Sequence, residues 1–436
     1  MRRLTAFAFV LVHALSPIAA RAQEQAAAQP TAALQQLVIE QLRRIEALEA
    51  RLAQLQQEVD VIRGQQPPAT IDEEDPLEEP FEHAYDGDPP MDPDGESPTA
   101  DLPRALNVDS YGSLRALAAI DTDGHSEVRN NSSRLGIRGE RKLIGALTAF
   151  GRYEMGINMV ANDRAILLIN GDPGTPIGQG SQAIASRLGF VGIGTPIGNF
   201  SWGKQWSPYY DVAEFTDQLQ VFSGLASGAF GAGTDGGIAG TGRAERAVQY
   251  REAWGPFAAA LQMQNRSLTL NDRQWADAFG GSVILGEQNG FAIGAAYNEA
   301  RDGVPTPTLN EPQLGDQAAI FGARFRSNWF YAGGTFATLK QHEVDDLGRR
   351  FDGTGFEIVL RQHFTERAWI EGAYSNLRPN ADHPGDFRVR FGVTNIVYNF
   401  SVASRLFLGF KLEDSLRSDR TDLTESTFAA GLNYTF

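Results

Sequence analysis

Apolar and polar residues alternate clearly over the last ten positions of the chain. Phe428, Ala430, Leu432, Tyr434 and Phe436 share one parity, and the residues between them are small or polar. A strand has a period of two, so these two sets fall on opposite faces of a sheet. An apolar, aromatic-tipped outer face is typical of strands in a transmembrane β-barrel. The last strand of a soluble sandwich would also fit, so the other segments have to decide.

Sixteen alternating segments occur between residue 107 and the C-terminus, and each is expected to be a strand. They centre on residues 108–120, 132–143, 146–158, 184–193, 199–206, 243–252, 255–265, 277–286, 290–300, 316–326, 328–339, 353–363, 367–378, 387–399, 402–414 and 424–436. Short connections such as 144–145 alternate with long ones such as 159–183 and 207–242. Outer-membrane barrels sort their turns and external loops in this way, whereas soluble sandwiches have no reason to do so. The expected fold class is therefore all-β, a sixteen-stranded antiparallel transmembrane barrel, residues 106–436, with a water-filled lumen.

The N-terminus has the features of a secretory signal peptide, predicted to span residues 1–22. Met1-Arg2-Arg3 precedes an apolar run over 4–15, and Ala20-Arg21-Ala22 provides the cleavage site. This run is too short to span a membrane as a helix, and no other charge-free stretch is long enough. The sequence contains no Cys, which excludes structural disulfides and a lipid-modified N-terminal Cys.

Two further segments are expected before the barrel. The first, residues 23–63, carries a heptad pattern: Leu34, Val38, Ile45, Leu48, Leu52, Leu55, Val59 and Ile62, with Gln41 interrupting it. This pattern predicts a periplasmic coiled coil of about four heptads, and a lone amphipathic helix is the alternative. The second, residues 64–105, has thirteen acidic residues, one base and many prolines, and is expected to be a disordered linker. It supplies most of the net charge of −16, so that charge says little about the barrel.

Several segments resemble the general trimeric diffusion porins of Gram-negative bacteria. The resemblance covers roughly residues 107–436 and is densest in residues 107–251. It rests on residues 133–140, 147–154, 186–192 and 200–204, and on Tyr209-Tyr210-Asp211, Phe215-Thr216-Asp217 and 243–250. The terminal Phe436 also resembles the C-terminal signature of outer-membrane proteins. A coiled-coil stalk is absent from the familiar enteric porins, although some other bacterial lineages attach one.

The resemblance implies that the third external loop folds into the barrel and narrows the pore. The resemblance places Arg134, Arg187 and Arg243 on the wall, and Arg115 on the strand face of the family's first wall base. Arg138 and Arg152 are added because they share the inward parity of their strands, and the expected loop residues are Asp211, Glu214 and Asp217. Charges of opposite sign across the constriction would create a transverse field that sorts solutes. The arginines could instead be rim charges or contacts to lipid phosphate. The acids could be solvated loop charges, and Asp211 and Glu214 could hold the loop to the wall.

Strand parity independently supports an inward direction for these arginines. Leu135, Ile137 and Phe190 are expected to face lipid if Arg134 and Arg187 face the lumen. An arginine on the lipid face near the midplane would cost about 2–4 kcal/mol, so the inward register is favoured.

The expected function is passive diffusion of small hydrophilic solutes and ions across the outer membrane. Val221 stands where the resembling family has a second loop acid, which predicts a weak anion preference. A solute-specific channel, for example for phosphate or another anion, is one alternative. An envelope-tethering structural protein with a barrel anchor is another. Expected partners are outer-membrane lipid and lipopolysaccharide, further copies of the chain in a homotrimer, and peptidoglycan or a periplasmic partner reached by the coiled coil.

Catalytic and metal-binding motifs find little support. The six His are scattered, and no Cys pair, His-x-x-x-His or Gly-x-Ser-x-Gly motif occurs. Asp121, Asp123 and Glu127 form part of a calcium-loop pattern, but an exposed first loop accounts for them better. We therefore expect no enzymatic activity, no cofactor, no metal and no nucleic-acid partner.

Overall fold

The computed structural model describes residues 107–160, 184–224, 226–231, 235–265, 276–301, 315–420, 422–423 and 426–436. The expected signal peptide, coiled coil and linker lie outside the described residues. Within those ranges no helix is both long and apolar enough to cross a membrane.

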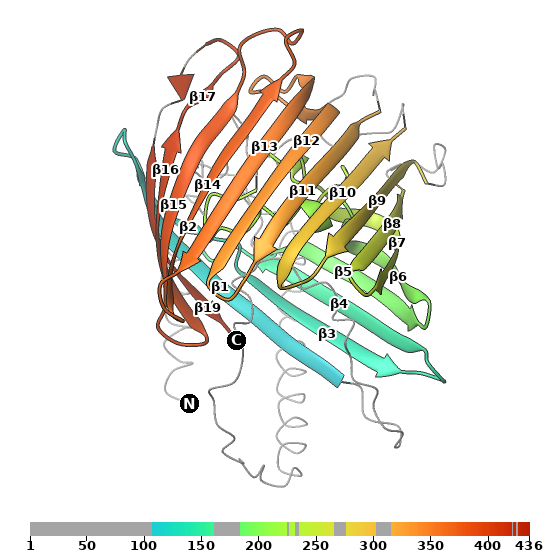
Figure 1. The fold of residues 1–436 in the computed structure, drawn as a ribbon. Coiled ribbons are helices and arrows are strands. Elements are labelled where there is room, and N and C mark those ends of the chain that lie inside the picture. The colour runs from blue at the N-terminus through green and yellow to red at the C-terminus, as the bar shows by residue number, and fades with distance from the viewer. Residues whose placement is uncertain are drawn as a thin grey trace, which may run out of the picture. The chain divides into compact units, whose positions relative to one another are not determined.

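The described chain forms a closed antiparallel β-barrel (Figure 1). Its strands are β1 (Asn107–Asp121), β2 (Ser126–Asn130), β3 (Arg134–Lys142), β4 (Thr148–Ile157), β5 (Ile184–Thr195), β6 (Gly198–Trp206), β7 (Arg243–Trp254), β8 (Phe257–Gln264), β9 (Ala278–Gly286), β10 (Gly290–Ala300), β11 (Gln317–Arg326), β12 (Phe330–Val344), β13 (Arg350–His363), β14 (Ala368–Pro379), β15 (Val389–Asn399), β16 (Ser404–Glu413) and β19 (Thr427–Thr435). Both β2 and β3 pair with β1, so they are two halves of one interrupted strand. The barrel therefore has sixteen strands, and pairing of β1 with β19 closes it. This confirms the predicted fold class.

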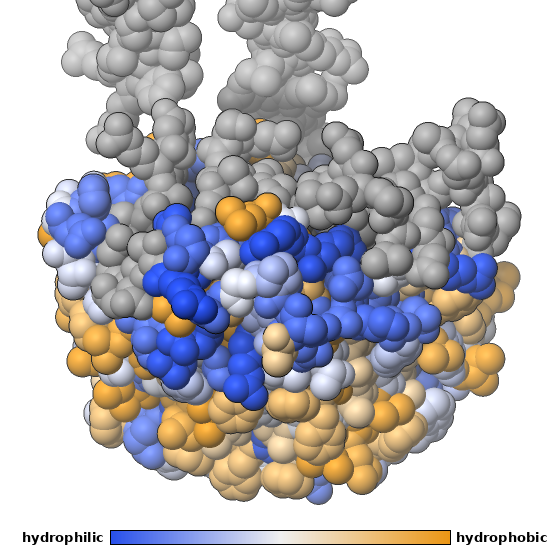
Figure 2. Space-filling view, turned by 90° about the horizontal axis from the view of Figure 1, so that it is seen from above, coloured by the Kyte–Doolittle hydropathy of each residue, from blue (hydrophilic) through white to orange (hydrophobic). Residues whose placement is uncertain are grey.

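The outer surface of the barrel is apolar because alternate residues of each strand point outward, and these residues are mostly hydrophobic. In β16, Leu406 and Leu408 are about half exposed whereas Phe407 between them is buried inside. Leu432 and Tyr434 in β19 are exposed in the same way. Seen from above, hydrophobic residues surround the side of the barrel and hydrophilic residues gather on its end (Figure 2). An apolar belt between polar ends is the surface that a lipid bilayer requires.

One predicted orientation is wrong. Phe190 was expected to face lipid, but it lies directly opposite Arg152, whose side chain points inward. Directly opposed residues share a face of the sheet, so Phe190 also points inward. The cause is a register shift opposite Glu154 and Met155, which leaves Arg187 as an extra residue. A bulge of this kind inverts the parity of every later residue in the strand.

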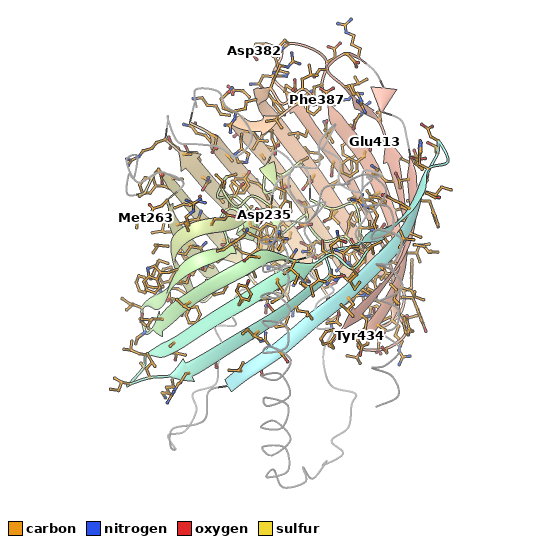
Figure 3. All side chains as sticks on the ribbon, turned by 180° about the vertical axis from the view of Figure 1, so that it is seen from behind. Asp235, Met263, Asp382, Phe387, Glu413 and Tyr434 are labelled. Atoms are coloured by element: carbon orange, nitrogen blue, oxygen red, sulfur yellow. The ribbon has the colours of Figure 1, made fainter. Side chains whose placement is uncertain are left out.

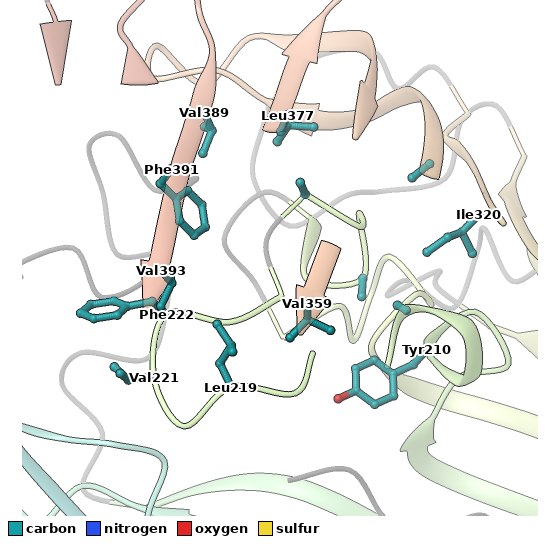
Figure 4. Packing of buried hydrophobic residues seen from close by; sticks show 14 of the residues in the cluster. Tyr210, Leu219, Val221, Phe222, Ile320, Val359, Leu377, Val389, Phe391 and Val393 are labelled. Atoms are coloured by element: carbon teal, nitrogen blue, oxygen red, sulfur yellow. The ribbon is translucent and has the colours of Figure 1, made fainter. Parts of the chain in front are cut away.

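The segment between β6 and β7 enters the lumen and fills part of it. It contains the short helix α4 (Tyr210–Ala213), and many of its apolar side chains are buried. Leu219 and Val221 of this segment lie close to Val393 of β15 in Figure 4. We call residues 207–242 the inward loop. Its inward course agrees with the expectation drawn from the resemblance.

Candidate functional site: the constriction

A wall carboxylate, Glu371 of β14, holds the tip of the inward loop. Its Oε1 accepts hydrogen bonds from the backbone N–H of Gln220, at 2.7 Å, and from Asn395 Nδ2, at 3.1 Å. Its Oε2 accepts from Arg361 Nε, at 3.2 Å, and from Trp369 Nε1, at 3.1 Å. Glu371 is only 1% exposed, so this carboxylate is fully engaged in fixing the loop and is not a charge in the pore.

A second wall carboxylate, Glu357 of β13, holds the next part of the loop. It accepts from the backbone N–H of Ala226 and from Thr216 Oγ1, each at 2.7 Å, and from Ser375 Oγ at 3.3 Å. Gly355 lies beside it, and a Cβ there would come within 1.6 Å of the Ala226 carbonyl oxygen. Only glycine therefore allows the loop backbone to approach this part of the wall.

Asp211 fixes the start of the inward loop. Arg251 donates to both of its carboxylate oxygens, at 2.9 and 2.7 Å, and Ser282 Oγ donates at 3.0 Å. The neighbouring Tyr210 ring stacks on Trp206 of β6 with 4.0 Å between the ring centroids. Asp211 therefore fastens the loop to β7 and β9, which was one of the two roles expected for it.

Asp217 is engaged by the loop itself, and Glu214 lies close to it in the same turn. Asp217 is half-buried and accepts a hydrogen bond from Tyr210 Oη, at 2.7 Å, and another from Ser223 Oγ. Glu214 is half-buried at the end of the α4 turn, and its backbone oxygen accepts from Gln218. Asp217 therefore shapes the loop, and its carboxylate is only partly available to a solute.

Val221 does not occupy a pore-facing position. It is 4% exposed, and its side chain packs so closely on β16 that a Cβ on Gly409 would lie 2.7 Å from it. Its backbone oxygen accepts a hydrogen bond from Asn395. An acid at this position would be buried against the wall, so the expected link between Val221 and charge in the pore is wrong.

Asp235 lies further along the loop, inside the outline of the barrel, whereas Asp382 lies at one end (Figure 3). Lys204 Nζ of β6 forms ion pairs with Asp235, at 2.7 Å, and with Glu245 of β7, at 2.9 Å. The Asp235 carboxylate also accepts from the backbone of Gly237. This acid therefore fastens the returning part of the loop to the wall.

Arg152 of β4 and Arg187 of β5 share one buried carboxylate, Glu154, on the wall. Arg187 Nε lies 2.7 Å from Glu154 Oε1, and Arg152 Nη2 lies 2.9 Å from Glu154 Oε2. Tyr111 Oη donates to the same carboxylate at 2.9 Å. The two predicted wall arginines thus come together around an acid that was not predicted.

Arg115 and Arg134 lie on the neighbouring strands, half-buried and buried respectively. In the barrel register Arg115 is opposite Asn433, which in turn is opposite Arg405 of β16. Arg134 is opposite Ser113, whose hydroxyl accepts a hydrogen bond from Arg115 Nε at 2.6 Å. Arg405, Arg115 and Arg134 therefore line the inner wall as a row, with Asn433 of β19 between the first two, and Arg152 of β4 and Arg187 of β5 extend this row.

The remaining two predicted arginines adjoin this group. Arg243 is 8% exposed, covered by the inward loop, and its guanidinium lies over the rings of Trp206 and Phe230, 4.8 and 5.9 Å from their centroids. It also interacts electrostatically with Arg187 and Glu154. Arg138 is directly opposite Arg152 in the barrel register, exposed near the end of β3, and lies 3.6 Å from Asp109. The structure therefore places both beside Arg152 and Arg187, although the inward loop covers Arg243.

The barrel, its inward loop and the row of arginines agree with a match to a known family. The family model described as Gram-negative porin matches residues 97–434. The chain belongs to the Gram-negative porin family. The outer membrane porin protein OmpD of Salmonella typhimurium is 25% identical over 355 residues, covering 76% of this chain and 91% of that protein. Outer membrane protein F of Serratia marcescens is 26% identical over 364 residues, again covering 76% and 91%.

Solved structures share the fold of this porin. A Salmonella typhi OmpF complex with daunomycin has a TM-score of 0.59 at 19% identity, covering 76% of this chain and 97% of the other. The anion-selective porin from Comamonas acidovorans has a TM-score of 0.54 at 16% identity, covering 76% and 100%.

Membership of the family establishes the general role of the chain. This porin is an outer-membrane channel for the diffusion of solutes, and its family and fold are those of a channel and not of an enzyme. Among the described residues no group of three or more His, Asp or Glu could hold a metal ion. Asp121 instead bonds to His125, and Glu127 lies 3.4 Å from Arg129.

Sequence reasoning missed three of the carboxylates that organise the site: Glu154, Glu357 and Glu371. Each lies in the middle of a strand and has the inward parity. A carboxylate at such a position is costly unless it is paired, so parity together with charge could have identified them.

Proposed function

We propose that the porin passes small hydrophilic solutes and ions with a weak preference for anions. The observation that supports this is the row of arginines on adjacent strands. Glu154 forms ion pairs with Arg152 and Arg187 and interacts electrostatically with Arg134. One carboxylate among three guanidinium groups leaves a positive local charge, which Arg115 on the next strand increases.

Three acids of the inward loop are engaged by other groups and therefore balance this charge only partly. Asp211 is paired with Arg251, Asp235 is paired with Lys204, and the Asp217 carboxylate accepts hydrogen bonds from within the loop. A low-dielectric wall lined by one sign of charge raises the local concentration of counter-ions. Anions are therefore expected to be enriched beside the row of arginines.

Neutralisation of single arginines tests the proposal. In a salt gradient across a planar bilayer, Arg134→Gln and Arg115→Gln should each move the reversal potential toward cations. Unit charges a few Å apart interact with about 1–4 kcal/mol, so each change should alter the permeability ratio severalfold. Arg367→Gln, in an exposed turn, should have no effect. A strongly cation-selective wild type that neither variant shifts would overturn the proposal.

We also propose that three copies of the porin assemble in lipopolysaccharide-containing outer membrane. The apolar belt supports contact with lipid, and an OmpT structure from Vibrio cholerae of similar fold is described as a trimer. In this proposal residues 23–63 form a periplasmic stalk that joins the three copies and contacts peptidoglycan or a periplasmic partner. Sedimentation of the purified porin in matched-density detergent should give the mass of three chains, and a monomer would refute the assembly.

A further inference from the structure

His342 occupies an enclosed position between the wall and the inward loop. It lies near the end of β12 and is 4% exposed. Its Nε2 lies 2.8 Å from the backbone oxygen of Gly228 and 3.4 Å from Thr241 Oγ1, both in the inward loop. Its Nδ1 faces Asp316 Oδ1 at 3.7 Å, just before β11. One imidazole ring thus connects two parts of the loop with two strands of the wall.

A bulge in β12 turns this side chain inward. Odd-numbered residues such as Leu339 point into the barrel, and the register then shifts between Leu339 and Glu343. Gln341 adopts a positive φ of 50° within the shift. His342 consequently points inward at an even position, where the loop fits closely around it. A Cβ on Gly231 would lie 2.9 Å from His342 Nε2.

The hydrogen-bond pattern requires a proton on Nε2. The Gly228 oxygen can only accept, and the Thr241 hydroxyl already donates to the Ala229 oxygen at 3.0 Å. A neutral ring with its proton on Nε2 would present the Nδ1 lone pair to the Asp316 carboxylate. The imidazolium instead offers an N–H on both sides. At 3.7 Å the contact between Nδ1 and Asp316 is a charge–charge contact and not a hydrogen bond, and Nδ1 has no hydrogen-bond partner within the described part of the chain.

The titratable groups that face the ring reinforce this preference. They are Asp316 before β11, Glu343 on β12 and Tyr209 on the inward loop. The Tyr209 hydroxyl donates to the Ser227 oxygen at 2.7 Å, so it orders the same part of the loop. Burial by itself disfavours a charged imidazole, but the two carboxylates beside the ring outweigh this effect and favour the charged form.

We propose that His342 is a proton-dependent latch on the inward loop. The imidazolium holds residues 226–231 against β12 and bridges them to Asp316. Loss of the proton leaves the Asp316 carboxylate facing a lone pair, so the connection weakens and the loop moves more freely in the lumen. The channel should therefore close rarely at acidic pH, and its closing rate should increase as the pH rises. This inference concerns the position of the loop and does not depend on the proposed anion preference.

Single-channel recording across pH tests the latch. Between about pH 5 and about pH 8, where histidine titrates, the closing rate of the wild type should rise along a single titration curve. Loss of one buried charge–charge contact should change that rate roughly tenfold. His342→Gln keeps a donor for Gly228 but cannot titrate, so its closing rate should not change with pH. His125→Gln, at an exposed turn, should retain the wild-type curve.

A second variant keeps the test decisive if His342→Gln does not fold. Asp316→Asn removes a carboxylate that favours the imidazolium, so the midpoint of the curve should move to lower pH by about one unit. The latch is refuted if the wild-type closing rate is independent of pH, if His342→Gln keeps the wild-type curve, or if Asp316→Asn leaves the midpoint unchanged.

Discussion

Replacement of Glu371 by Gln should loosen the tip of the inward loop without creating a cavity. The two side chains have nearly the same volume, but Gln replaces one acceptor oxygen with an NH₂ group. Two donors therefore lose their acceptor in either orientation of the amide. They are Gln220 N and Asn395 Nδ2 in one orientation, and Arg361 Nε and Trp369 Nε1 in the other.

The size of the effect follows from these contacts. Hydrogen bonds to a charged acceptor are worth about 1.5–3 kcal/mol each, and an unsatisfied buried donor adds to the loss. Rotation of the amide can preserve the pair with Arg361, so we expect a cost of about 2–3 kcal/mol, concentrated at Gln220. A difference of about 2.8 kcal/mol corresponds to roughly a hundredfold rise in the population of displaced loop.

Planar-bilayer recordings can detect this change. Glu371→Gln should increase open-channel noise and lower the voltage at which the channel closes. It should also shift selectivity further toward anions, because Arg361 loses its counter-charge. Glu366→Gln removes the same charge from an exposed turn and should behave as wild type. A Glu371→Gln channel with wild-type noise and closing voltage would show that this carboxylate does not hold the loop.

Three further predictions concern other parts of the chain. Burial alone would raise the pKa of Asp345, in an external loop, but hydrogen bonds from Arg349 outweigh it and hold the pKa below its ordinary value. This contribution to loop order is present at neutral pH and lost as the pH falls through the lowered pKa, so acid, or Asp345→Asn at neutral pH, should increase cleavage of this loop by proteases. Leu408→Cys should resist water-soluble thiol reagents in the membrane, whereas Arg405→Cys should react; the reverse would refute the register. The isolated segment 34–62 should sediment as an oligomer, and a monomer at high concentration would exclude a coiled coil.

The strands could be predicted because a membrane barrel imposes a regular pattern of apolar residues on the sequence. Every strand meets lipid on one face and water or the inward loop on the other, so its apolar residues recur with a period of two. The predicted segments 290–300 and 243–252 match β10 and the start of β7 closely. Bulges produce no recognisable sequence pattern. This is why the predicted lipid-facing orientation of Phe190 is wrong and why the inward orientation of His342 could not be predicted.

The contacts of the inward loop were harder to predict than the wall. A strand position fixes which way a side chain points, so Arg134 and Arg187 could be assigned to the lumen. A loop position fixes no direction. Val221 was therefore aligned with a pore-facing acid although it packs on Gly409. Partners such as Glu357 and Ala226 are 131 positions apart, so no local pattern connects them.

The wall and loop acids hold the inward loop in place, whereas the arginines supply net charge to the lumen. The position of the loop is therefore linked to the selectivity of the pore. Glu357 and Glu371 bind backbone N–H groups of the loop, and Asp211 binds Arg251, so each acid is consumed by a structural contact. The row, by contrast, contains several arginines but only one carboxylate, Glu154, and therefore carries a net positive charge. A change that frees a structural acid would therefore move the loop and alter the charge of the lumen together. Conductance and selectivity should accordingly change in parallel when a structural acid is replaced, whereas replacement of Arg115 or Arg134 should change selectivity alone.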